Sequence, residues 1–484
     1  MSAGLIIALI LTYFLVLIGV SYLTGRKSDN ETFFTGNRNS PWYVVAFGMV
    51  GASLSGVTFI SIPGWVEASS FSYMQVVLGY VVGYTVIIKV LLPLYYRLQL
   101  TSIYSYLEGR FGASSYKTGA SFFMISRIIG AAFRLYLVAV VLQLIFDQFK
   151  DPANPDSGIP FWATVAVTIL LIWVYTFRSG IKTIVWTDTL QTTFMLLAVI
   201  LTVWAIKETL IPDEGLMSYI ASSNKSQIFF WDEWQSANAF WKNFASGAFI
   251  TIVMTGLDQD MMQKNLSCRS LGDAQKNMFW LSIILVFVNL IFLSLGVLLY
   301  DYAEVKGITE VGDKLYPAVA LSGDLGLAVT AFFVIGLIAA AYSSADSALT
   351  ALTTSFCVDI LGIEKMESHL AKRIRTWVHL ALSVVLMLVI IAYRYLVDDS
   401  VIKELFTIAG YTYGPLLGMY AFGMFTKYKV KDRAVPIIAI LCPVVTYGIK
   451  YFVESNTDYR FNFELLIING FLMFLGLILL KRSK

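Results

Sequence analysis

The sequence has few histidines, few cysteines and little charge. It contains 2 His and 3 Cys among 484 residues, and only 14% of the residues are Asp, Glu, Lys or Arg. A histidine-based metal site, a catalytic triad or a disulfide framework is therefore not expected. No basic tract indicates nucleic-acid binding. A soluble domain carries about 25% charged residues, so the low charge argues against one.

Apolar residues take the place of the missing charge. They make up 57% of the chain and form runs of about 20 residues that do not alternate with polar ones. Runs of this length predict membrane-spanning helices, so we expect an all-α integral membrane protein. We predict about thirteen transmembrane helices, near residues 3–24, 42–65, 73–98, 116–148, 161–176, 183–206, 243–263, 277–301, 319–358, 374–396, 401–425, 434–452 and 463–481.

The distribution of Lys and Arg predicts the orientation of the chain. With thirteen spans, these residues lie in the segments on one side about twice as often as on the other. Because the cytoplasmic side is the positive one, the N-terminus is predicted outside and the C-terminus in the cytoplasm. We expect a multi-pass protein of the plasma membrane.

The second and seventh predicted spans contain glycine and hydroxyl residues in matching positions. The second span includes Gly51 and Gly56, and the seventh includes Gly247 and Gly256. The two spans start about 200 residues apart, and each opens a group of five spans. A pair of glycine-interrupted spans in corresponding halves is typical of transporters whose binding site is built from broken helices.

The ninth predicted span carries a carboxylate and several hydroxyls. Ser343, Asp346 and Ser347 lie at positions i, i+3 and i+4, so they share one helix face. A carboxylate in the membrane is costly and indicates a functional site. A broken second span would add free carbonyl groups near Gly51 and Leu54. Oxygen atoms of this kind suit a hard monovalent cation.

Four sequence motifs resemble those of one transporter family. They are SLSGVTFISIPG at 53–64, TIVWTDTLQ at 183–191, GLDQDMMQKNLSCRSLGDAQK at 256–276 and AAAYSSADSALTALTTSFCVD at 339–359. On these motifs the chain resembles the sodium/solute symporter family, which includes sodium-coupled sugar, sialic acid and proline transporters. The similarity covers roughly residues 5–480.

The resemblance implies a LeuT-like inverted repeat of five plus five helices, with discontinuous second and seventh helices. The implied divisions are a first helix and inner loop at 1–41, the first repeat at 42–206, an extracellular loop at 207–242, the second repeat at 243–425 and two C-terminal helices at 426–484. The implied sodium ligands are Gly51, Leu54, Ala340, Ser343 and Ser344. A second cation site, found in some members, would use Asp188, Ser343, Asp346 and Ser347.

The sequence departs from the family at Asp346, where the members compared have a hydroxyl residue. Asp188 and Asp346 would then face one site. Two carboxylates could bind a second cation more strongly, or one of them could hold a proton, because like charges disfavour double ionisation.

The substrate site is expected between the second, third, seventh and eleventh spans. The predicted contacts are Ser55, Thr58, Arg134, Thr251, Thr255 and Thr407. Most sugar contacts of the sugar transporters are absent, whereas Ser55 and Thr58 agree with the sialic acid type. Arg127 and Arg134 lie within the fourth span, near the position where that type has an arginine for the substrate carboxylate. Arg134 either binds such a carboxylate or pairs internally with Asp346 or Asp188.

The predicted function is sodium-coupled symport of a small polar or anionic solute, such as a sugar, a sugar acid or another carboxylate, by alternating access. A proton-coupled symporter of the same fold remains an alternative, as do a channel and a non-transporting sensor. The absence of a filter-like repeat argues against a channel, and we expect no signalling domain after the last span. No enzyme activity is predicted. The expected partners are sodium, the substrate and membrane lipid, but not nucleic acid, and we expect a functional monomer.

Overall fold

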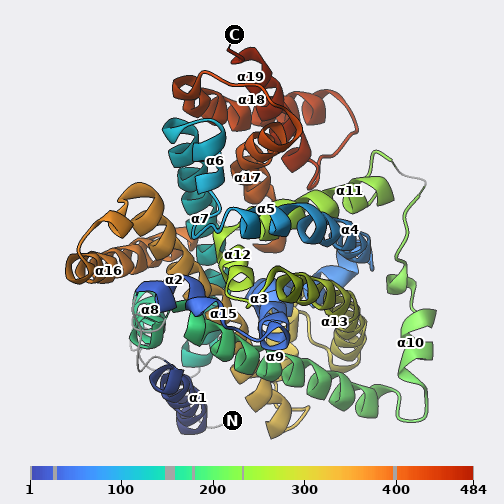
Figure 1. Ribbon diagram of the computed structural model, residues 1–484. Coiled ribbons are helices and arrows are strands. Elements are labelled where there is room, and N and C mark those ends of the chain that lie inside the picture. The colour runs from blue at the N-terminus through green and yellow to red at the C-terminus, as the bar shows by residue number, and fades with distance from the viewer. Residues whose placement is uncertain are drawn as a thin grey trace.

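The structure is almost entirely helical (Figure 1). It is a computed structural model that describes residues 3–24, 30–147, 158–176, 180–231, 234–395 and 401–482. Within these residues there is no strand, and only two isolated β-bridges occur, between Ser40 and Cys268 and between Val430 and Lys481.

The helices fall into a long set, a short set and single turns. The long helices are α1 (Ala3–Thr24), α3 (Trp42–Ser69), α4 (Tyr73–Val86), α7 (Ala113–Asp147), α8 (Phe161–Thr176), α9 (Gly180–Leu210), α11 (Phe240–Thr251), α13 (Leu271–Lys306), α15 (Leu327–Ser355), α16 (Ser368–Tyr393), α17 (Val401–Phe425), α18 (Val435–Asn456) and α19 (Leu465–Leu479). The short helices are α2 (Asn30–Thr35), α5 (Leu92–Arg97), α6 (Ser105–Arg110), α10 (Leu216–Ser222), α12 (Gln259–Leu266) and α14 (Leu315–Leu321). Single 3₁₀ turns are η1 (Gly36–Arg38), η4 (Asn224–Ser226), η6 (Gly312–Lys314), η8 (Ile363–Lys365) and η9 (Asp432–Ala434), and π-helical turns are η2 (Ile87–Leu91), η5 (Ile252–Gly256) and η7 (Phe356–Ile360).

Over the described residues, every predicted span overlaps one of these helices or a consecutive run of them; residues 148 and 396, at the ends of two predicted spans, lie outside the described ranges. Seven helices in the described ranges are long and apolar enough to cross a membrane, or eight if the two halves of the bent α3 form one span. Three shorter apolar helices cover Ala8–Leu23, Phe161–Val174 and Leu465–Leu479. An all-helical membrane architecture is therefore confirmed, while the total of thirteen spans stays a prediction.

Helix α15 forms the centre of the molecule. Every residue from Gly336 to Ser355 is buried, and the helix packs against α3, α7, α9 and α16 (Figure 1). The serines and the aspartate of α15 therefore face protein and not lipid. Buried polar groups in this position need partners within the protein or in a bound ligand.

Helices α4 and α11 approach each other closely at two glycines. A methyl group on Gly79 would overlap the carbonyl oxygen of Phe244, and one on Gly247 would overlap the carbonyl oxygen of Val76. Small residues permit this kind of backbone contact between membrane helices. The contact holds α11 against α4, and both helices line one polar cavity.

Candidate functional site

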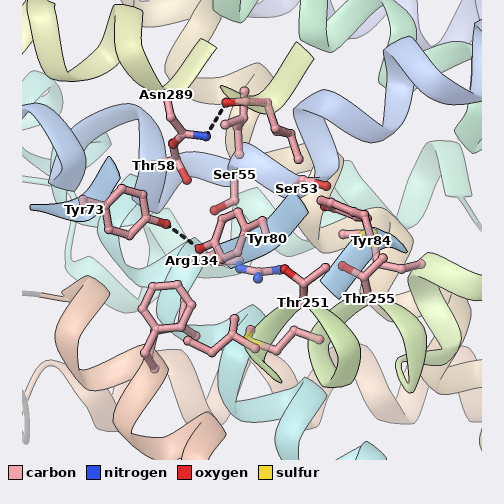
Figure 2. Close-up of a pocket in the computed structure, with 17 residues that line it drawn as sticks. Ser53, Ser55, Thr58, Tyr73, Tyr80, Tyr84, Arg134, Thr251, Thr255 and Asn289 are labelled. Atoms are coloured by element: carbon pink, nitrogen blue, oxygen red, sulfur yellow. Dashed lines mark hydrogen bonds between the residues drawn. The ribbon is translucent and has the colours of Figure 1, made fainter. Parts of the chain in front are cut away.

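A polar cavity of about 80 Å³ lies beside the bend of α3 (Figure 2). Helices α3, α4, α7, α11 and α13 and the turn η5 supply its polar wall: Ser53, Ser55, Thr58, Tyr73, Tyr80, Tyr84, Arg134, Thr251, Thr255 and Asn289. Its apolar wall consists of Leu54, Ile250, Met254, Met261, Leu285, Leu405 and Phe406. The cavity thus combines one cationic group, many hydroxyl groups and an apolar floor, which suits a small polar solute.

Most of the predicted substrate contacts come together in this cavity. The wall contains Ser55, Thr58, Arg134, Thr251 and Thr255. Thr407 does not line it, whereas its neighbours Leu405 and Phe406 do. The eleventh predicted span, α17, therefore contributes apolar contacts, and its threonine lies elsewhere on the helix.

Three tyrosines of α4 were not predicted as contacts. Tyr73, Tyr80 and Tyr84 are spaced by seven and four residues, so they lie on one face of the helix. The hydroxyl groups of Tyr73 and Tyr80 are 2.8 Å apart and hydrogen-bonded (Figure 2). The helical spacing of tyrosines in the third predicted span could have identified them, because a tyrosine stripe offers hydroxyl donors on an apolar surface.

Helix α3 bends at the cavity. Ser55 has φ 50° and ψ 173°, which lies outside the helical region, and the segments Trp42–Gly56 and Thr58–Ser69 meet at 54°. Gly56 lies between α7 and α15, since a Cβ on Gly56 would be 3.2 Å from Val138 Cγ2 and 3.8 Å from the Cα of Ala341. A non-helical residue interrupts the i to i−4 hydrogen bonds, so carbonyl groups before the bend become available.

The chain from α11 to α12 is also interrupted. The π-helical turn Ile252–Gly256 is capped by Leu257. The next residue, Asp258, has an extended backbone, with φ −106° and ψ 122°. The Asp258 side chain accepts hydrogen bonds from the first amides of α12, at Asp260 and Met261. The two interruptions lie in the second and seventh predicted spans, where glycine and hydroxyl residues were noted.

Arg134 has a buried guanidinium that is short of partners. Its relative exposure is 6%, and neither Nε nor Nη1 has a hydrogen-bond partner. Within the described residues it makes no ion pair, although the guanidinium lies on the cavity wall beside Thr251 and Tyr80 (Figure 2). A buried charge without a partner is costly, so this group is suited to an anionic ligand.

Arg127 has a different environment, two helical turns before Arg134 on α7. It forms ion pairs with Asp260 and, at 3.8 Å, with Asp258. The hydroxyl of Tyr413 donates to Asp258 Oδ2 over 2.5 Å. Arg127 is therefore a structural partner of α12, and the two arginines of α7 are not equivalent. The sequence DQDMMQK at 258–264 places three charges, at Asp258, Asp260 and Lys264, within seven residues, and this density could have indicated buried ion pairs.

The predicted sodium ligands lie on α3 and α15, which pack together beside the bend. Gly51 donates its N–H to Thr192 Oγ1 of α9 at 3.0 Å, and a side chain at Gly51 would overlap Thr192. Ala340, Ser343 and Ser344 are at most 1% exposed. The Ser344 hydroxyl has no hydrogen-bond partner in the described chain, so its oxygen is available to a ligand.

One carboxylate of the predicted second cation site, that of Asp188, forms an ion pair with a lysine outside the predicted set. Asp188 Oδ2 lies 2.7 Å from the Nζ of Lys264, and Asp188 Oδ1 accepts a hydrogen bond from the Ser343 hydroxyl at 2.6 Å. Asp346 Oδ1 accepts the backbone N–H of Ser347 at 2.6 Å. Lys264 was counted with an inner loop at the sequence level, yet its side chain is 1% exposed.

The relatives found by comparison with known proteins include sodium-coupled transporters named for sialic acid, iodide or monocarboxylates. The sodium/sialic acid symporter NanT of Aliivibrio fischeri is 25% identical over 465 residues, which cover 92% of this chain and 86% of the relative. The sodium-coupled monocarboxylate transporter 1 of Mus musculus is 24% identical over 426 residues, 85% of this chain and 67% of that protein.

A solved structure has the same fold. A sodium-coupled sialic acid symporter in a substrate-bound, outward-open state superposes with a TM-score of 0.82 at 18% identity, covering 98% of this chain and 97% of that one. The shared fold is LeuT-like. The profile of the sodium:solute symporter family matches residues 33–434. The chain therefore belongs to the sodium:solute symporter family and is a sodium-coupled membrane transporter rather than an enzyme.

Proposed function

We propose that this symporter carries a small carboxylate anion whose carboxylate group binds Arg134. The observation that supports the proposal is the buried guanidinium of Arg134, which faces the cavity without a protein partner at Nε and Nη1. Arginine and carboxylate form two parallel charge-assisted hydrogen bonds, so a substrate carboxylate would supply the missing acceptors. The names of the two relatives above also refer to carboxylates, sialic acid in one and monocarboxylates in the other.

The size of the cavity favours a short-chain monocarboxylate over a large sugar acid. Its volume is about 80 Å³. A cavity of about 150 Å³ holds benzene, and pockets for drug-sized ligands measure about 300–1,000 Å³. The hydroxyl groups of Ser55, Thr58 and Thr251 can bond a hydroxyl or keto oxygen next to the carboxylate.

Uptake into proteoliposomes tests this function. Radiolabelled acetate, lactate, pyruvate, sialic acid and glucose would be offered with an inward sodium gradient, a potassium gradient or a proton gradient. We expect accumulation of a short monocarboxylate with sodium only, and its loss in Arg134→Lys, which keeps the charge but not the planar fork. Thr407→Ala serves as the control, because Thr407 does not line the cavity.

Other outcomes would contradict parts of the proposal. Uptake of sialic acid but not of short acids would refute the size argument while leaving the carboxylate contact in place. Uptake of glucose alone would refute the role of Arg134. Accumulation with a proton gradient in the absence of sodium would favour the proton-coupled alternative.

The sodium ligands proposed are the carbonyl groups of Gly51, Leu54 and Ala340 with the hydroxyls of Ser343 and Ser344. The bend of α3 supports the carbonyl contribution, and the unpartnered Ser344 hydroxyl supports the contribution of α15. In this proposal α3 and the α11–α12 segment are discontinuous spans of a five-plus-five repeat, which rock between outward-open and inward-open states.

The proposed placement is a bacterial inner membrane with thirteen spans, the N-terminus outside and the C-terminus in the cytoplasm. The bias of Lys and Arg toward one set of loops supports this orientation. We propose a functional monomer, because the candidate contacts for sodium and substrate all come from one chain.

A further inference from the structure

The buried ammonium of Lys264 contacts two buried carboxylates, with Asp188 nearer and Asp260 at 3.9 Å. Nζ of Lys264 and Oδ2 of Asp188 are 2.7 Å apart, and both side chains are 1% exposed. Lys264 lies on α12, Asp188 lies on α9, and the two are 76 positions apart in the sequence. The contact meets the distance of an ion pair, although neither atom makes a hydrogen bond within the described residues, and burying two charges is costly.

The pair occupies the place where a second cation would bind. Asp188 is one of the two carboxylates of that set, with Asp346, and its other oxygen already accepts the hydrogen bond of Ser343 at 2.6 Å. An ammonium group is a compact point charge of the same sign and unit charge as sodium. With Lys264 in contact, a sodium ion on the same oxygen would face a like charge within a few ångströms.

We propose that the ammonium of Lys264 is a built-in cation that replaces a second sodium ion at Asp188, so that the protein binds one sodium ion. A tethered cation cannot leave with the substrate. The ammonium of Lys264 balances the charge of Asp188 throughout the transport cycle. Only the sodium site formed by α3 and α15 then exchanges its ion with the solution.

The pair also positions the ligands of the remaining sodium site. Ser343 donates its only hydroxyl hydrogen to Asp188, so its lone pairs stay free for a cation. Thr192 lies one turn after Asp188 on α9 and accepts the N–H of Gly51. Lys264 therefore holds, through Asp188, the helix face that contacts two of the proposed sodium ligands.

The experiment measures sodium binding directly and does not depend on the substrate. Purified protein is titrated with ²²Na⁺ in an equilibrium binding assay, without any organic solute. We expect one sodium ion per wild-type chain and a Hill coefficient of about 1. Lys264→Gln frees Asp188 and should raise binding to two ions, and Lys264→Arg should stay at one because it keeps the charge.

Two results overturn the proposal. One is two sodium ions per wild-type chain. The other is a folded Lys264→Gln protein that still binds one ion with unchanged affinity. If Lys264→Gln fails to fold, the double variant Lys264→Gln with Asp188→Asn removes both charges. We expect this variant to bind one sodium ion with several-fold weaker affinity, because Ser343 has lost the carboxylate that orients its hydroxyl. Two ions, or unchanged affinity, in this double variant would also refute the proposal.

Discussion

Arg134 and Arg127 lie on the same helix, are both buried and differ in their partners, which permits a paired test. Arg134→Met removes a guanidinium that makes no ion pair with the described residues, and its exposure is 6%. Arg127→Met removes the partner of Asp258 and Asp260. Breaking a buried pair leaves an uncompensated charge and costs roughly 3–5 kcal/mol. Removing an unpaired buried charge carries no such cost.

The two variants should therefore separate stability from binding. We expect Arg127→Met to lower the thermal unfolding midpoint of the purified protein, whereas Arg134→Met should leave it unchanged or raise it. Hydrogen bonds to a charged partner contribute about 1.5–3 kcal/mol. Loss of one such bond corresponds to roughly a 10- to 150-fold weaker affinity for the carboxylate substrate.

Thermal unfolding with and without the carboxylate identified by uptake measures both effects, because a ligand stabilises the state that it binds. Lactate at saturating concentration with sodium is the first ligand to use. If Arg134→Met is as unstable as Arg127→Met, then Arg134 has an internal partner and the proposed contact is wrong. If Arg134→Met is stable and is still stabilised by the substrate to the wild-type extent, the carboxylate binds elsewhere.

Three further changes have defined outcomes. Ser344→Ala removes a buried hydroxyl without a protein partner, so half-saturation of uptake by sodium should rise at least several-fold while membrane insertion stays normal; unchanged sodium dependence would remove Ser344 from the site. Glu367 and Ser222 are both exposed, so each can be replaced by a single cysteine. In intact cells a cysteine at position 367 should be protected from an impermeant thiol reagent, and one at position 222 should react; the reverse pattern would invert the topology. Gly247→Ala should destabilise the protein by about 1–3 kcal/mol, because its methyl group would overlap the backbone of α4, and an unchanged unfolding midpoint would contradict this close contact.

The helical membrane fold could be predicted from the sequence because long apolar runs have few alternatives. The bend of the second predicted span was expected from Gly51 and Gly56, yet the residue with the positive φ is Ser55 between them. Glycine composition indicates that a helix can be interrupted, but tertiary contacts decide at which residue this happens.

The candidate site was predicted in part. Ser55, Thr58 and Arg134 come together in one cavity, because hydroxyls and a cation inside apolar spans are informative by themselves. The partner of Asp188 could not be predicted. Lys264 follows the seventh predicted span, where a charge is ordinarily solvated, and no spacing rule links positions 188 and 264. Pairing between distant helices depends on the packed structure.

The bend of α3 has a thermodynamic consequence for transport. Leu54, whose carbonyl is a proposed sodium ligand, is bonded directly to Ser55, whose side chain lines the substrate cavity. An ion that fixes the backbone at this point also fixes the orientation of the adjacent side chain. Linkage is reciprocal: the factor by which sodium increases the affinity for the solute must equal the factor by which the solute increases the affinity for sodium. The adjacent residues Leu54 and Ser55 would thus be enough to couple sodium binding to solute binding, and no conformational change elsewhere in the protein would be required.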